Sequence, residues 1–275
     1  MNGVFSARRL CRRRAELKLS AMKILILIAG IADPKWPLPA LINPQTLQEH
    51  SASHAALSPF DEAALELALK LRESDPSNTL HALVGGSEKF ARKIAEWRLD
   101  SVHRFDESAA AAWDANRFAK GLVEASKSVC DPSLVLVGRE FGDFDDGCVP
   151  ALIAHDFGMP QFSLVMDVAF SDGAMWGTRQ RAGSIERFRV PERALLSVTN
   201  DPRNRLRHPL MKNVMAAKRL NVPAVALTQV AATVELRSFE LARPAKRGGA
   251  CRMLAGTPSE QCLALAEVLL QRSIA

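Results

Sequence analysis

The sequence features with the clearest chemical meaning lie between an apolar run at Leu134–Val137 and a segment that begins at Val149. Gly138 ends the run, and a loop rich in glycine and aspartate follows it. Pro150 then falls in the first turn of a helix expected over 149–157, where a missing N–H costs least. The free N–H groups at such a helix start hold phosphate groups in many α/β proteins. A nucleotide is therefore the first ligand to consider, and a solvated acidic loop that binds nothing is the alternative.

Residue spacing gives little support to other chemistry. Asp143, Asp145 and Asp146 offer oxygen ligands for Mg²⁺, but no phosphate-binding lysine or further clustered acid accompanies them, so we expect no metal site. The six histidines and five cysteines form no metal-binding spacing, and His50 and His54 fall in an expected loop. The sequence also lacks the G-x-S-x-G, G-x-x-x-x-G-K-[ST] and H-E-x-x-H motifs.

Alternating strands and helices surround the aspartate-rich loop. A first strand over 24–28 precedes a proline-rich loop that runs from Asp33 to about Pro59. Apolar residues at helical spacing, with Asp61 and Glu62 in the first turn, then predict a helix over 59–73. Such alternation predicts a parallel sheet with helices on both faces. The other elements expected in this half are strands over 80–84, 102–105 and 134–137, a helix from Ser87 to about Trp97, and a helix over 108–129.

After Pro160 the pattern changes. The segment 185–190 alternates as a half-buried antiparallel strand does. We therefore predict a doubly wound α/β fold over residues 22–234, with a mostly parallel sheet and an antiparallel extension. The remaining elements expected in this domain are strands over 161–168, 174–181, 194–198 and 224–227, and a helix over 209–218.

Residues 235–275 are expected to form a C-terminal arm. Its first part, to about Lys246, is polar and contains proline, and a helix is expected over 258–272. Leucines at 263, 265, 269 and 270 of this helix need a surface to cover, and that surface is expected on a partner chain.

The distribution of charge and the length of the apolar runs exclude several classes of protein. The net charge of +6 is concentrated in residues 1–21, where six basic residues against Glu16 give +5, so we expect no nucleic-acid binding. No apolar run approaches the roughly 20 residues of a membrane helix. The basic segment 1–21 is either a targeting peptide or sequence upstream of a true start at Met22, and we favour the second. The expected location is the cytoplasm of a bacterium, or the mitochondrial matrix if the segment is a transit peptide.

Several segments occur in an order that one family shares. Lys23–Ile28 with Asp33-Pro34 matches its first strand and loop, and Ser58–Ala64 matches its Asn-Pro-Phe/Tyr-Asp-Glu segment. The stretch from Gly138 to Pro160 has the family's length without a gap. Gly183 and Glu186 fall in its Asp-Gly-Gly-x-Glu region, and Arg207–Pro209 followed by Met215–Lys218 matches its Pro-Arg-Tyr…Ile-Met-x-Ala-Lys element. In these features residues 22–275 resemble the β subunit of an electron transfer flavoprotein.

The resemblance implies an electron carrier and not an enzyme. Its expected partners are an electron transfer flavoprotein α subunit that holds most of an FAD, a flavin-dependent dehydrogenase that donates electrons, and a quinone oxidoreductase or similar acceptor. The β subunit itself is implied to bind AMP or a second FAD, while Phe60 approaches the shared flavin or, alternatively, packs as a core aromatic. The residues that the resemblance implies for the β nucleotide pocket are Leu27, Ser58, Gly85, Gly86, Gly138, Asp143, Gly147, Cys148 and Val149.

The chain also departs from the family. Gly147, Cys148 and Val149 replace the Asn, Gln or Thr side chains that face the phosphate, so weaker or altered nucleotide binding is expected, although backbone amides remain. For docking of the dehydrogenase the resemblance implies Met211, beside Arg207, with a core methionine and solvated arginines as the alternative. Two other functions stay open: an adenine-nucleotide-dependent hydrolase or ligase of similar fold, and a docking scaffold without bound nucleotide.

Overall fold

The computed structural model describes residues 21–105, 113–171, 173–227, 230–235, 237–238 and 253–273. The predictions for the N-terminal segment up to residue 20, for the helix start at 108–112 and for most of the polar stretch 235–246 lie outside these residues. Contacts divide the chain into two units, residues 1–239 and 240–275, which are described separately.

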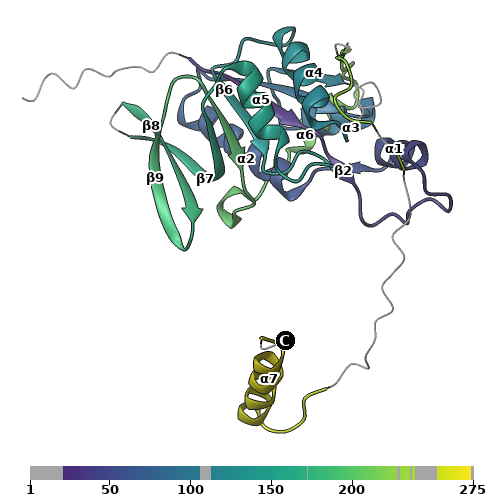
Figure 1. The fold of residues 1–275 in the computed structure, drawn as a ribbon. Coiled ribbons are helices and arrows are strands. Elements are labelled where there is room, and N and C mark those ends of the chain that lie inside the picture. Colours follow the sequence, from purple (N-terminus) through teal and green to yellow (C-terminus); the bar gives the residue numbers. More distant parts are fainter. Residues whose placement is uncertain are drawn as a thin grey trace, which may run out of the picture. The chain divides into compact units, whose positions relative to one another are not determined.

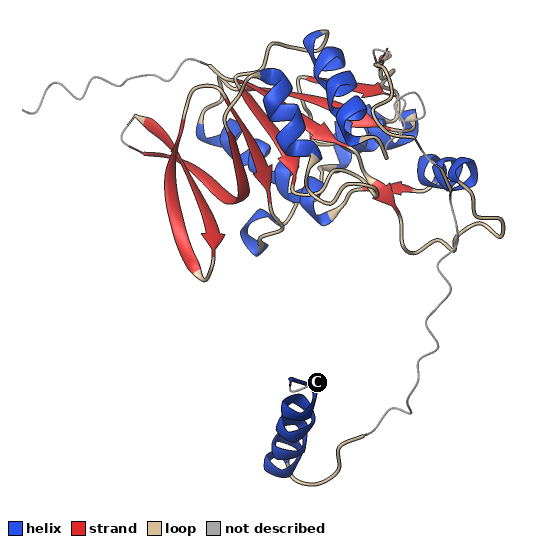
Figure 2. Ribbon diagram, viewed as in Figure 1, coloured by secondary structure: helices blue, strands red, loops and turns tan. Residues whose placement is uncertain are grey.

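One nine-stranded sheet organises the first unit (Figures 1 and 2). Its strand order is β11-β5-β4-β1-β6-β10-β7-β8-β9, and the pairs from β11 to β7 are parallel, whereas β7-β8 and β8-β9 are antiparallel. The predicted fold class is thereby confirmed. The strands of this sheet are β1 (Lys23–Ile28), β4 (Thr79–Gly85), β5 (Ser101–Phe105), β6 (Leu134–Gly138), β7 (Gln161–Ser171), β8 (Ala174–Arg181), β9 (Ser184–Val190), β10 (Ala194–Val198) and β11 (Ala224–Val225).

The two faces of the sheet are covered by different helices (Figure 1). Alternate residues of β1 point to opposite faces, so Ile24 and Ile26 join one apolar cluster and Leu25 and Leu27 join the other. The first cluster contains α2 (Pro59–Ser74) and α3 (Glu88–Ala95), and the second contains α4 (Ala115–Lys127) and α5 (Val149–Phe157). Burial on both faces explains why β1 and β6 read as continuous apolar runs.

The proline-rich loop after β1 contains more structure than predicted. It holds the helix α1 (Pro44–Ser53) and a two-stranded sheet of β2 (Ile31–Ala32) and β3 (Ala55–Ala56). Asn43 accepts a hydrogen bond from the Thr46 N–H, and Thr46 Oγ1 accepts one from the Asn43 N–H, so a capping box starts α1. The expectation of a plain loop around His50 and His54 was therefore wrong: His50 belongs to α1, and His54 ends it.

Other boundaries differ by a few residues. Trp113 and Asp114 precede α4, and the Asp114 side chain accepts a hydrogen bond from the Arg117 N–H, so the predicted helical start before residue 115 was wrong at 113–114. The short turn η2 (Pro202–Asn204) follows β10, and the predicted helix at 209–218 is α6 (Met211–Ala217). Strand β7 runs three residues past the predicted end, because it pairs with β8 as far as Ser171.

The second unit contains α7 (Pro258–Ser273), close to the predicted bounds. Thr257 and Glu260 cap its start, since Glu260 Oε2 accepts hydrogen bonds from the Thr257 N–H and hydroxyl. The four leucines expected to need a surface, Leu263, Leu265, Leu269 and Leu270, are exposed in this unit. Among the described residues, no helix combines the length and the apolar character that crossing a membrane requires.

Candidate functional site

Three parallel strands end side by side at the predicted site. Leu27 of β1 lies in register with Leu83 of β4 and with Val137 of β6, so the segments after these strands leave the sheet at one edge. Ligands of α/β proteins bind at such an edge. The Leu27 side chain itself is fully buried in the cluster with α4 and α5. The Leu27 side chain is therefore not available to a ligand in this structure.

The start of α2 is locked at this edge by a buried carboxylate. Ser58 Oγ accepts a hydrogen bond from the Asp61 N–H, and Asp61 Oδ2 accepts from the Ser58 N–H and from the Gly30 N–H, each at 3.2 Å. Asp61 is fully buried, and its other oxygen, Oδ1, has no hydrogen-bond partner among the described residues. Burial raises the pKa of Asp61 to about 6, although the hydrogen bonds from Ser58 and Gly30 oppose this rise. Ser58 therefore acts as a helix cap whose hydroxyl is already engaged.

Gly138 lets the end of β6 approach α2 closely. A Cβ atom at this position would stand 2.9 Å from the Phe60 Cβ and 3.2 Å from the Phe60 carbonyl carbon. The half-buried Phe60 ring lies beside Arg139, whose guanidinium carbon is 5.9 Å from the ring centroid. The structure thus brings together Gly138 and Phe60, two of the predicted site residues, and adds Arg139.

Asp143 fastens the aspartate-rich loop to the loop after β1. Its Oδ2 accepts a hydrogen bond from the Ala32 N–H at 2.8 Å. Although the residue is exposed overall, partial burial of the carboxyl group raises its pKa, against the effect of the hydrogen bond from Ala32. The observed role of Asp143 is to join two loops.

The N–H groups at the start of α5 are already occupied by a carboxylate. Asp145 Oδ1 accepts hydrogen bonds from the N–H groups of Gly147, Cys148 and Val149, at 2.9, 2.9 and 3.1 Å. Asp145 Oδ2 accepts from the Phe141 N–H at 2.8 Å. Asp145 was not among the predicted site residues, and the signal that could have identified it is its place three residues before the N-cap position, Cys148.

The residues present do not fit a phosphate group at this helix start. The amides of residues 147–149 donate to Asp145, and Gly147, Cys148 and Val149 carry no hydroxyl or amide side chain. Val149 is also buried, and the pKa of the Cys148 thiol is raised to about 11, chiefly by partial burial of this otherwise exposed residue and then by Asp145. Asp145, Asp146 and Cys148 place their ligand atoms within 4.8 Å of one another, but Asp145 uses both oxygens for backbone N–H groups.

The remaining predicted residues, Gly85 and Gly86, lie at the end of β4. The Gly86 N–H donates to the Phe105 carbonyl, and Gly86 has a φ of +93°, which favours glycine. A cavity of about 500 Å³ lies near these residues. It is lined by α3 and by the loop after β1, including Trp36, His54, Ser87 and Lys93, and none of the ten residues predicted for the cofactor lines it.

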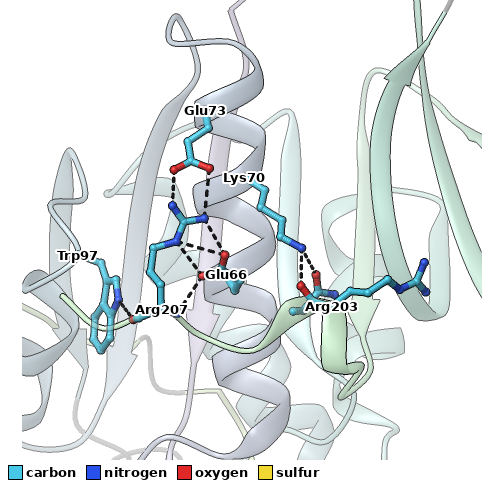
Figure 3. Close-up of polar contacts among 7 residues, drawn as sticks. Glu66, Lys70, Glu73, Trp97, Arg203 and Arg207 are labelled. Atoms are coloured by element: carbon cyan, nitrogen blue, oxygen red, sulfur yellow. Dashed lines mark hydrogen bonds and ion pairs between the residues drawn. The ribbon is translucent and has the colours of Figure 1, made fainter.

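The loop before α6 is held against α2 by ion pairs (Figure 3). The Arg207 guanidinium pairs with Glu66 at 2.6 Å and with Glu73, and these carboxylates raise its pKa while Arg207 lowers that of Glu73. The Trp97 Nε1–H donates to the Arg207 carbonyl at 2.8 Å. Lys70 Nζ reaches the Arg203 carbonyl from the same helix, α2. Arg207 thus fixes this loop, and its contact with a partner stays a prediction.

Two apolar side chains next to this fixed loop face solvent. Leu210 and Met211 are 60% and 74% exposed at the start of α6. The alternative of a core methionine does not hold for Met211 in this chain. A rigid loop that presents apolar side chains is a suitable docking surface, because little conformational entropy is lost when a partner covers it.

Comparison with known proteins finds similarity to electron transfer flavoproteins. The family model described as electron transfer flavoprotein domain matches residues 46–230. The electron transfer flavoprotein subunit beta of Mycobacterium bovis is 27% identical over 214 residues, which cover 75% of this chain and 80% of that protein. The protein of the same name from Syntrophomonas wolfei is 28% identical over 200 residues, covering 70% and 76%. The caffeyl-CoA reductase-Etf complex subunit CarD of Acetobacterium woodii is 28% identical over 153 residues, covering 54% and 58%.

Proposed function

Because the chain belongs to the electron transfer flavoprotein β family, we propose that it is the β subunit of a heterodimer that carries electrons between flavin enzymes. In this proposal an α subunit holds most of an FAD, a flavin-dependent dehydrogenase donates the electrons, and a quinone oxidoreductase or similar acceptor receives them. The chain itself has no bond-making role. The observation that carries the proposal is the family match over residues 46–230, which includes the start of α2, the loop before α5 and the start of α6.

The surroundings of Phe60 suit one wall of a shared flavin site. FAD supplies the redox chemistry, and the protein supplies binding, orientation and charge. Phe60 is half-buried at the edge where β1, β4 and β6 end, and Arg139 places a cation beside its ring. An aromatic side chain and a guanidinium suit a planar, electron-accepting ring. The exposed leucines of α7 support contact with a second chain, since they lie uncovered in their own unit.

Co-expression with a candidate α subunit tests the proposal. We expect a yellow complex only when both chains are made together, with about one FAD released per shared site on denaturation. A colourless pair of separate chains would contradict the assignment. ATP turnover by the isolated chain would favour the hydrolase or ligase alternative instead.

The docking role of α6 needs a separate measurement. Met211→Glu should slow electron transfer from the dehydrogenase about tenfold or more, because a charged side chain replaces an apolar contact, while FAD content stays unchanged. Ile185→Glu is the matched control, since Ile185 is 72% exposed on β9, at the sheet edge opposite β11, the strand that follows α6. Equal transfer rates for the two variants would contradict a docking role for Met211.

A further inference from the structure

We propose that Asp145 is a built-in anion that fills the phosphate position of the β nucleotide site and keeps AMP and other phosphate esters out. The inference concerns the second cofactor of the proposed electron carrier and therefore rests on the proposed function. It does not concern the flavin shared with the α subunit.

The Asp145 carboxylate lies at the first N–H groups of α5. Four backbone N–H groups donate to its two oxygens at 2.8 to 3.1 Å, and three of them belong to the consecutive residues 147–149 at the start of α5. A phosphate at a helix start uses the same consecutive N–H groups. The carboxylate thus takes both the position and the charge of a phosphate group.

The backbone of the loop before α5 is shaped for this contact. Gly142 and Gly147 have φ values of +80° and +102°, in the left-handed region that other residues rarely adopt. These two glycines flank Asp145 and allow the loop to turn back over the helix start. Asp143, between the same glycines, ties the loop to Ala32 and so limits its movement.

The residues at the start of α5 lack side-chain donors that would compensate for a displaced Asp145. If a phosphate displaced Asp145, the carboxylate and the neighbouring Asp146 would remain beside a dianion and repel it. Gly147, Cys148 and Val149 offer no side-chain hydroxyl or amide to offset this repulsion. Binding of the nucleoside part would remain independent of these groups.

The experiment compares AMP with adenosine, which lacks the phosphate, on the co-purified heterodimer by calorimetric titration. We expect wild type to release FAD but no AMP on denaturation, and to show no preference for AMP over adenosine. Asp145→Ala should bind AMP at least about tenfold more tightly than wild type, because it frees charged-group donors. Asp146→Ala is the matched control: it removes the same charge one residue away and should improve AMP binding by less than about threefold.

Each outcome decides the matter. Stoichiometric AMP in wild type, a tenfold preference of wild type for AMP over adenosine, or equal gains for the two variants would overturn the proposal. If Asp145→Ala does not fold, the wild-type comparison of AMP with adenosine decides it alone. A complex without FAD would count against the electron carrier and not against Asp145, because the two ligands are measured separately.

Discussion

The starts of α2 and α5 place a carboxylate on their first N–H groups in two different ways. In α2 the carboxylate is Asp61, which lies within the helix, forms a capping box with Ser58 and is fully buried. In α5 it is Asp145, which lies in the loop before the helix, while the N-cap residue Cys148 makes no side-chain bond. Both arrangements satisfy donors that a helix start leaves free.

The two carboxylates differ in whether water or an external anion can replace them on their N–H groups. Asp61 also holds the Gly30 N–H, so its removal would leave buried donors unpaired. Asp145 is only half-buried, and Cys148 beside it is exposed, so water or an external anion can reach the freed N–H groups. The start of α2 is part of the core, whereas the start of α5 is open to solvent and is the position that we propose Asp145 fills in place of a phosphate.

The largest expected effect is the pH dependence that Asp61 imposes. Its pKa in the folded protein is about 6, above the ordinary 3.8, so the folded state binds this proton more tightly than the unfolded state does. Stability from this group is fully present below about pH 4 and is lost as the pH rises through 6, by on the order of 3 kcal/mol. Asp61→Asn should flatten this part of the dependence. Urea unfolding from pH 4.5 to 7.5 measures it, and equal slopes for the two proteins would contradict the assignment.

A smaller effect is expected at Gly138, where β6 approaches α2 before the loop to α5 begins. Gly138→Ala should lower the free energy of unfolding by about 2 kcal/mol, because the new Cβ meets Phe60 at 2.9 Å. Gly86→Ala is the comparison variant, since its Cβ meets nothing within 4 Å and its cost, about 1 kcal/mol, comes from the positive φ alone. Denaturant midpoints for both variants, converted with a common slope, test this order.

The sequence was sufficient to predict α5, because Pro150 marks the start of this helix and the apolar run 134–137 marks the strand before it, β6. It was not sufficient to predict α1, because prolines and polar residues around 33–59 have the composition of a loop, and the capping box of Asn43 and Thr46 was overlooked. The parallel sheet followed from the alternation of elements. The close approach of Gly138 to Phe60 did not, because it depends on how two distant segments pack.

The contacts of individual site residues could not be predicted from the sequence either. Composition indicated that an acidic loop precedes α5, but three aspartates were available and the pattern did not show which one turns toward the helix. In the structure Asp145 lies between Gly142 and Gly147, which both have positive φ values, and residue composition does not predict such backbone angles. Arg207 was predicted to contact a partner because it resembles a family position. In the structure it pairs with Glu66 and Glu73, which lie more than 130 residues earlier in the chain.

A third test compares the two carboxylates directly. Asp145→Ala should destabilise the protein by about 1.5 kcal/mol, because water replaces the carboxylate on four N–H groups. Added inorganic phosphate should restore part of this loss in Asp145→Ala and none in Asp61→Ala, whose donors are buried. Thermal melts with and without phosphate measure the effect. Equal recovery of both variants would show that the two helix starts do not differ in access.

The smallest expected effect concerns the N-cap residues themselves. Ser58 has the extended backbone of a capping residue, with φ −71° and ψ 158°, so Ser58→Ala should cost about 1 kcal/mol through loss of its bond from the Asp61 N–H. Cys148 has helical angles, φ −87° and ψ −29°, which do not direct a side chain back to the helix N–H groups. Cys148→Ser should therefore change stability by less than about 0.5 kcal/mol, although serine is a preferred cap. A clear gain in unfolding free energy for Cys148→Ser would mean that Asp145 leaves the start of α5 incompletely satisfied.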